Sequence, residues 1–114
     1  MIAVIFEVWP TQGRVDDYFD LATALKSDLQ DFDGFVSIER FESVTTPGKY
    51  VSLSFWRDEE AVRAWRNLEE HRIVQTQGRE RIFADYRLRV ATVVRDYGMN
   101  EREEAPTDSR GRHG

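Results

Sequence analysis

Residues 2–9 read Ile-Ala-Val-Ile-Phe-Glu-Val-Trp, and this stretch decides the fold of the chain. It is rich in β-branched and aromatic residues, which indicates a β-strand. Successive side chains of a strand point to opposite faces, so the even-numbered residues share one face and the odd-numbered residues the other. Both sets are apolar except for Glu7, and a strand of this kind needs a packed layer on each of its faces.

Working outward from this strand, the pattern changes to helical spacing. Apolar residues recur at intervals of three and four over residues 14–31, which predicts a helix with one buried stripe. Residues 35–44 and 49–56 alternate between apolar and polar side chains and predict two strands. Thr45 to Gly48 separates the two strands as a turn, so we expect an antiparallel hairpin.

The second half of the chain predicts a further helix followed by a last strand. Asp58 is placed to cap a helix that begins with two glutamates. The pattern weakens over residues 67–70, where we expect a break, and a second helical piece is predicted from about residue 71 to 85. Residues 86–95 predict the last strand.

The resulting order, β-α-β-β-α-β, is the ferredoxin-like pattern of an α+β protein, with a four-stranded antiparallel sheet and both helices on one face. The other face is also apolar, and the chain has no third helix to cover it. A second copy of the same sheet is the economical cover, which predicts a homodimer that forms a dimeric α/β barrel. We assign residues 1–98 to this single domain and expect residues 99–114, which are polar and charged, to form a disordered tail.

Composition excludes several classes of function. Hydrophobic residues make up 40% and charged residues 32% of 114 residues, as in soluble globular proteins. No apolar run is long enough to span a membrane and the N-terminus does not resemble a signal peptide, so a cytoplasmic location is expected. The net charge of −5 argues against nucleic acid as a partner. The absence of cysteine and the presence of only two histidines argue against a metal site.

Several segments together resemble the antibiotic biosynthesis monooxygenase superfamily. They are Phe55-Trp56-Arg57-Asp58-Glu59-Glu60-Ala61, then Trp65 and His71, then Gly78-Arg79-Glu80, and finally Tyr86-Arg87-Leu88-Arg89-Val90-Ala91. The resemblance covers residues 2 to about 98. It implies a dimeric α/β barrel with a pocket between the helices and the sheet of each subunit.

The resemblance also implies a range of activities. Some members oxidise polycyclic phenols to quinones with molecular oxygen alone, whereas others degrade haem. The haem-degrading branch has an asparagine on its first strand and a histidine about ten residues after the helical tryptophan. Here the strand position holds Glu7, His71 follows Trp65 by six residues, and Gln75 stands ten residues on. We therefore expect no cofactor, with haem as the alternative.

Three residues on the second helical region are candidate catalytic residues. His71 has the one side chain in the folded part whose ordinary pKa, near 6.5, suits a general base at neutral pH. Trp65 could line the pocket and offer its indole N–H, although ordinary core packing is an alternative role. Asn67, beside Arg66 at the expected break, could donate a hydrogen bond to a substrate oxygen or to dioxygen, or could simply cap a loop.

A second group of residues are candidates for substrate binding: Phe6, Glu7, Trp9, Trp56, Phe83 and Tyr86. The aromatic members could form walls for a flat ligand, and the alternative for each is packing within the sheet or at a subunit contact. A carboxylate on an apolar strand needs a partner, so Glu7 is either in an ion pair with Arg87, Arg89 or Arg95 or is an acid–base group with a raised pKa.

The sequence thus favours a cofactor-independent monooxygenase, or a related oxidoreductase, that acts on a small hydroxylated aromatic ligand. Two alternatives remain open at this point. One is a protein that binds or degrades haem, and the other is a non-catalytic dimeric module that binds a small molecule. A pocket too small for an aromatic ring would favour the binding module.

Overall fold

The computed structural model describes residues 1–77 and 81–108 of the chain. Residues 78–80, which belong to the segments that resemble the monooxygenases, and residues 109–114 lie outside the described residues. The elements are β1 (Ile2–Pro10), α1 (Val15–Leu29), β2 (Phe35–Glu42), β3 (Tyr50–Trp56), α2 (Glu59–Gln77) and β4 (Phe83–Thr92). The predicted order of strands and helices is confirmed.

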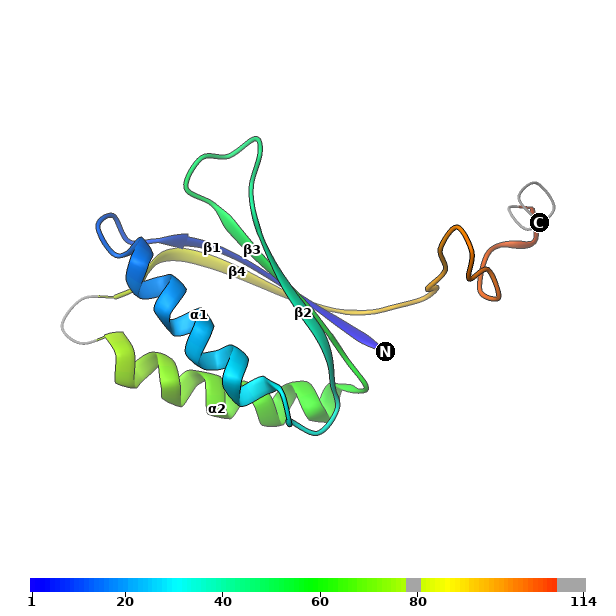
Figure 1. Ribbon diagram of the computed structural model, residues 1–114, viewed down its shortest axis with the longest axis horizontal. Helices are drawn as coiled ribbons and strands as arrows, with labels where there is room; N and C mark the ends of the chain where they lie inside the picture. The colour runs from blue at the N-terminus through cyan, green and yellow to red at the C-terminus, as the bar shows by residue number, and fades with distance from the viewer. Residues whose placement is uncertain (78–80, 109–114) are drawn as a thin grey trace.

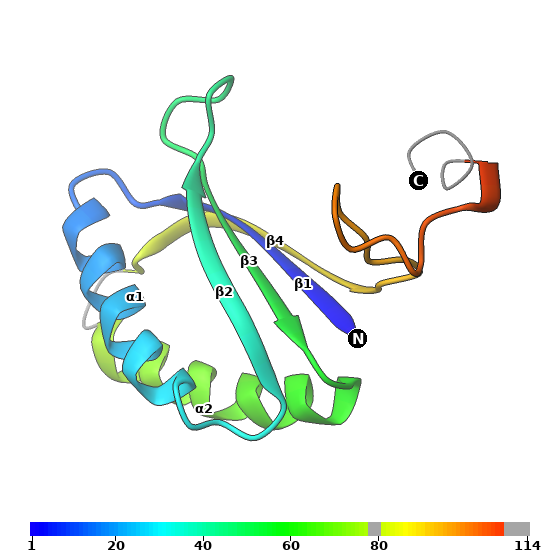
Figure 2. The same cartoon turned by 45° about the vertical axis from the view of Figure 1, so that its right-hand side comes forward.

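The four strands form one antiparallel sheet in the order β2-β3-β1-β4. β1 lies inside the sheet and pairs with β3 on one side and with β4 on the other. Both helices pack against the same face of the sheet, and no further helix or strand of the described residues covers the opposite face (Figures 1 and 2). The fold class predicted from the sequence, a ferredoxin-like α+β domain, is confirmed.

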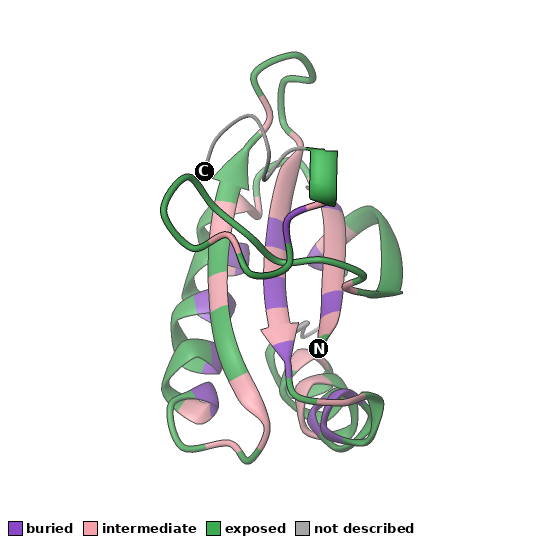
Figure 3. Cartoon of the chain, turned by 90° about the vertical axis from the view of Figure 1, so that its right-hand side faces the viewer, coloured by how far each residue is buried: buried purple, intermediate pink, exposed green. Residues whose placement is uncertain are grey.

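The core lies between this sheet and the two helices. The even-numbered residues of β1 face the helices, and Val8 among them is completely buried. Leu25 and Leu29 of α1 and Trp56 of β3 are buried in the same cluster. Burial is greatest on the central strands and is low on the edge strand β2 (Figure 3).

The expected break in the second helix is wrong, because α2 runs without interruption from Glu59 to Gln77. Val62, Trp65, Glu69 and Ile73 follow at helical spacing, and all four line one cavity beneath the helix. Glu69 interrupts the apolar stripe of the helix, so the helical periodicity is hard to recognise in the sequence. The helix then ends earlier and the last strand begins earlier than predicted, at Phe83 instead of residue 86.

The chain beyond β4 runs away from the sheet and the helices (Figure 1). Its described part is held by local hydrogen bonds, such as that donated by the Gly98 amide to the Glu101 carbonyl (2.7 Å). Ala105 is buried within these turns. Whether residues 99–114 are disordered in solution stays a prediction.

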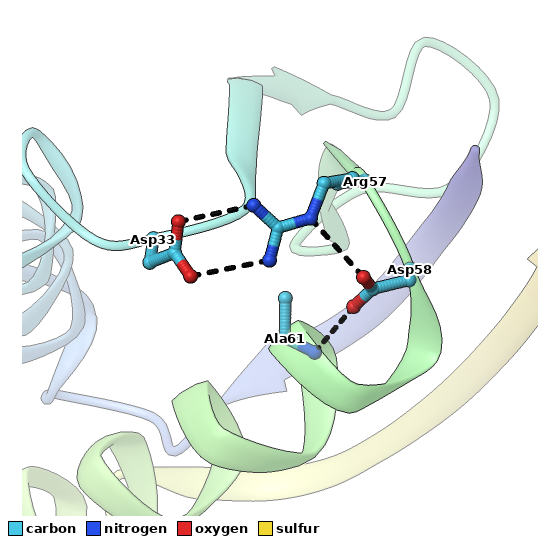
Figure 4. A network of polar contacts seen from close by, with 4 residues as sticks. All are labelled: Asp33, Arg57, Asp58 and Ala61. Atoms are coloured by element: carbon cyan, nitrogen blue, oxygen red, sulfur yellow. Dashed lines mark hydrogen bonds and ion pairs between the residues drawn. The ribbon is translucent and has the colours of Figure 1, made fainter.

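A polar network fixes the start of α2 against the loop that precedes β2 (Figure 4). The Ala61 amide donates to Asp58 Oδ1 (2.9 Å), which confirms Asp58 as the N-cap. Arg57 donates to both carboxylate oxygens of Asp33 (3.0 and 3.1 Å), and these contacts lower the pKa of Asp33. The network brings Gly34 directly beneath the first turn of the helix.

We predict that Gly34→Ala destabilises the fold by roughly 2–5 kcal/mol, because two penalties combine. Gly34 has φ +86°, a conformation that alanine adopts with strain, and a Cβ there would stand 2.5 Å from the Cβ of Ala61. Gly13→Ala is the matched control, since Gly13 has φ +85° but a methyl group added there would have nothing within 4 Å. Chemical denaturation measures both variants, and equal losses of stability would contradict the close contact.

Candidate functional site

An inner cavity of about 70 Å³ lies between the helices and the sheet. Apolar side chains from β1, α1, β3 and α2 form most of its wall, including Val4, Leu21, Leu25, Trp56 and Trp65. The polar groups on its wall are fewer: Tyr18, Arg40, Ser52, Ser54, Arg66 and Glu69. A mostly apolar cavity with a few convergent polar groups is the usual form of a small-molecule site.

An outer cavity of about 580 Å³ lies between the second half of α2 and β4. The two cavities share six residues of their walls: Phe6, Arg66, Glu69, Ile73, Phe83 and Leu88. The outer cavity alone is within the range of ~300–1,000 Å³ typical of ligand sites, whereas the inner one is smaller than the ~150 Å³ cavity known to hold benzene. A ring therefore fits the outer cavity, and only a small substituent fits the inner one.

Glu69 stands on the shared wall, between the two cavities. Burial raises the pKa of its carboxyl group above the ordinary value, while a hydrogen bond from the Trp65 indole and the positive charge of Arg40 oppose that rise. A carboxyl group with a raised pKa that faces a cavity is a candidate acid–base group.

Tyr18 and Arg40 lie on the wall of the inner cavity alone. Tyr18 is 4% exposed, and its phenolic oxygen is buried without a hydrogen-bond partner among the described residues. Burial raises the pKa of this phenol, and the positive charge of the adjacent Arg40 guanidinium opposes that rise. Arg40 comes from β2, where it pairs with Ser52 of β3 and so faces the helices.

Aromatic rings form the rest of the site. Trp56 and Trp65 lie with ring centroids 6.0 Å apart, and the Trp56 indole N–H donates to Ser54 Oγ (2.9 Å). Phe6 contacts Phe83 at 5.7 Å and Tyr86 at 5.6 Å between centroids. These flat apolar surfaces suit a planar ligand, which would be held by stacking and edge contacts.

Five of the nine residues proposed from the sequence line these cavities. Trp65 and Trp56 lie on the inner wall, Phe6 and Phe83 on the wall of both cavities, and Tyr86 on the outer wall. His71 and Asn67 are on α2 but are exposed and line neither cavity. The catalytic roles of His71 and Asn67 stay predictions, and the structure brings neither side chain to the cavities.

Glu7 and Trp9 lie on the opposite face of the sheet. Glu7 accepts hydrogen bonds from Lys49 Nζ (2.9 Å) and Arg89 Nη1 (2.8 Å). These two cations lower the pKa of Glu7, so the alternative of an acid–base group with a raised pKa is wrong, and the expected ion pair with Arg89 is present. Lys49 also lies over the Trp9 ring, 5.2 Å from its centroid.

Sequence reasoning missed three residues of the site, namely Tyr18, Arg40 and Glu69. Tyr18 lies in the apolar stripe of the first helix and Arg40 in the second strand, and neither position by itself indicates a site residue. A signal for Glu69 was present, because residues 62, 65, 69 and 73 have helical spacing and one of them is an acid. The sequence contains no comparable signal for Arg40. A bulge between Phe35 and Ser37 shifts the register of β2, so simple alternation along the strand does not reveal that Arg40 faces the helices.

The walls of the cavities offer few of the side chains that hold haem iron. Proteins hold haem iron through histidine, cysteine, methionine or tyrosine, and among the described residues that line the cavities only the tyrosines, Tyr18 and Tyr86, are of these types. The described part of the chain also contains no group of three or more His, Cys, Asp or Glu residues placed to hold a metal ion. Within that part, neither helix has the length and apolar character needed to cross a membrane.

Comparison with known proteins agrees with this architecture. Residues 1–77 match the sequence profile of the family described as antibiotic biosynthesis monooxygenase. Jasmonate monooxygenase ABM of Pyricularia oryzae is 39% identical over 107 residues, which are 94% of this chain and 50% of that protein. The chain thus spans about half the length of this relative.

Two solved structures share the fold at low sequence identity. SnoaB, a cofactor-independent oxygenase from Streptomyces nogalater, has a TM-score of 0.67 and 10% identity, over 83% of this chain and 94% of its own. MhuD, solved with manganese protoporphyrin IX bound, has a TM-score of 0.67 and 19% identity, over 86% of this chain and 99% of its own. The profile match and the similarity to the Pyricularia protein show that this chain belongs to the antibiotic biosynthesis monooxygenase family.

Proposed function

We propose that this chain is a monooxygenase that needs no bound cofactor and oxidises a small hydroxylated aromatic compound to a quinone. In the balanced reaction, a phenol with a ring C–H and one O₂ give a quinone and one water. One oxygen atom enters the ring and the other leaves in the water. The observation that carries the proposal is the ionisable Glu69 on the shared wall of two mostly apolar cavities.

The substrate ring would occupy the outer cavity, between Phe83 and Tyr86 on β4 and the second half of α2. Its hydroxyl group would then face Glu69. The ionised carboxylate would take the phenol proton, and the electron-rich phenolate would react with dioxygen. A base works best when its pKa lies near the working pH, and burial moves the pKa of Glu69 in that direction.

Trp65 would hold Glu69 in place for this proton transfer. Its indole N–H donates to the carboxyl group, and Trp65 itself is buried between the helix and the sheet. Ring contacts with Phe32 (5.4 Å) and Trp56 (6.0 Å) fix the orientation of the indole. The surrounding apolar walls would exclude water, which strengthens each polar interaction inside the site.

Two other functions remain as candidates. Haem binding is favoured by the fold shared with MhuD, but the walls lack a histidine ligand. A non-catalytic binding module is favoured by the small inner cavity, yet the outer cavity of about 580 Å³ has room for a ring. Titration with haem, followed in the Soret region, separates these candidates: a saturating shift would place haem first.

We also propose that the chain works as a homodimer joined through the face of the sheet that the helices leave uncovered. Ile5, Val51, Leu53 and Phe55 bring apolar side chains to that face, opposite the cavities. An apolar sheet face without a covering layer marks an interaction surface. A two-fold axis would place the same residues of the second copy against it.

Leu53→Asp should convert such a dimer into monomers, because a carboxylate in the middle of the interface would be buried without a partner. Size-exclusion chromatography with light scattering gives the mass directly. Val44→Asp is the matched control, since Val44 is apolar but 99% exposed in the turn between β2 and β3. A Leu53→Asp protein that keeps the mass of the unaltered protein would refute this interface.

Oxygen uptake with hydroquinones and polycyclic phenols tests the proposed reaction. We expect Glu69→Gln to lower turnover by about 100-fold or more, the usual contribution of a general base. Turnover of the unaltered protein should rise with pH through the raised pKa of Glu69, because the ionised carboxylate is the active form. Glu69→Gln should abolish that rise.

His71→Ala is the companion variant in this experiment. Its side chain is exposed and lines neither cavity, so a base at Glu69 predicts nearly unchanged turnover. Loss of activity in His71→Ala with activity retained in Glu69→Gln would instead assign the base to the histidine.

A further inference from the structure

The inner end of the site has polar groups that the proposed reaction does not use. Arg40, Tyr18 and Ser52 lie on the wall of the inner cavity, beyond Glu69 as seen from the outer cavity. We propose that this inner cavity is a subsite for a carboxylate, so that the substrate is an aromatic acid with its acidic group on a short stem. This inference rests on the proposed function for the place of the ring but not for the subsite itself.

The charge of Arg40 is the first argument for this subsite. Arg40 belongs to none of the ion pairs among the described residues, which use Arg14, Lys49, Arg57, Arg72 and Arg89. Its side chain faces the helices from β2 and borders a mostly apolar cavity. A guanidinium in such surroundings is stabilised by an anion, and its planar donors match a carboxylate in a two-bonded geometry.

The buried hydroxyl of Tyr18, which lies close to Arg40, is the second argument. Tyr18 is only 4% exposed, and its phenolic oxygen has no hydrogen-bond partner among the described residues. A buried polar group without a partner is destabilising, and such groups are rare in folded proteins. A carboxylate in the inner cavity would accept a hydrogen bond from this hydroxyl, and that bond would supply the missing partner.

The size of the inner cavity sets the shape of the ligand. About 70 Å³ is less than half the volume of the ~150 Å³ cavity known to hold benzene, so the inner cavity is too small for a ring. A carboxylate with one methylene group is of this size. The ring attached to it would then lie in the outer cavity of about 580 Å³, against Phe6 and Phe83 on the wall that the cavities share.

Glu69 is the carboxyl group that faces Arg40 from α2, and its own charge opposes a second carboxylate nearby. Burial already raises the pKa of Glu69, and a bound carboxylate would raise it further. In the complex, the ionised form of Glu69 that the proposed reaction needs would therefore appear at a higher pH than in the free protein. The ligand charge is then balanced by Arg40.

Binding of naphthylacetate to the purified full chain, measured by calorimetry, tests the subsite. Naphthylacetamide is the matched neutral ligand, with the same ring and nearly the same shape. We expect the acid to bind at least about tenfold more tightly than the amide, since a charged partner strengthens hydrogen bonds by this amount. Arg40→Gln should remove this preference, whereas Arg63→Gln, an exposed site on the same helix as Glu69, should leave it intact.

The Tyr18→Phe variant distinguishes a ligand-binding role of the Tyr18 hydroxyl from a purely structural one. Removing the unpartnered hydroxyl should raise or leave unchanged the melting temperature of the ligand-free protein, and should weaken binding of the acid. Lower stability with unchanged binding would overturn the assignment. Loss of the preference in Arg66→Gln but not in Arg40→Gln would also overturn it, because Arg66 lies on the wall of both cavities.

The same experiment separates failure of the subsite from failure of the proposed reaction. Tight, Arg40-dependent binding of the acid without oxygen uptake on hydroxylated analogues would leave the subsite standing and refute the monooxygenase. Equal oxygen uptake on phenols with and without a carboxylate, unaffected by Arg40→Gln, would refute the subsite and leave the monooxygenase standing.

Discussion

The pairing of β1 inside the sheet is the constraint on which the rest of the structure depends. β1 pairs with β3 from Ile2 to Val8 and with β4 along its whole length, so its register fixes which side chains reach each face. One face meets α1 and α2 and forms the core with its cavities. The other face is apolar around the Glu7 ion pairs and is the surface that we assign to a second copy.

The cavities exist because the packing against this sheet is incomplete at one place. Ser52 and Ser54 are buried on the side of β3 that faces the helices, where most strands of this kind would carry larger apolar residues. Their small side chains leave the inner cavity open, and Arg40, Tyr18 and Glu69 bring polar groups to its wall. Protein interiors are usually closely packed, and a cavity with polar groups on its wall does not stabilise the fold. Such exceptions to efficient packing are expected at functional sites.

Sequence patterns were sufficient for the fold because each element has a clear period. The alternation of β1, the stripe of α1 and the Asp58 cap are local features, and each is found where it was expected. The site was less predictable for the same reason, since its residues break those periods. Glu69 in the apolar stripe suggested a break in a helix that is continuous, and the bulge in β2 decides that Arg40 faces the cavity.

The distribution of tryptophans offers a direct view of the site. Trp56 and Trp65 border the inner cavity, whereas Trp9 lies on the opposite face beneath Lys49. The sequence has three tryptophans, so the indole N–H resonances are few and each can be assigned by substitution. A ligand in the cavities must therefore change the environment of two of these resonances and leave the third almost unaffected.

The central claim, that the paired cavities between helices and sheet are the ligand site, is tested most directly by recording these indole resonances during titration with naphthylacetate. We predict saturable shifts of Trp65 and Trp56, with Trp9 nearly unchanged. Shifts confined to Trp9 would place the ligand on the opposite face of the sheet and contradict the assignment of the site.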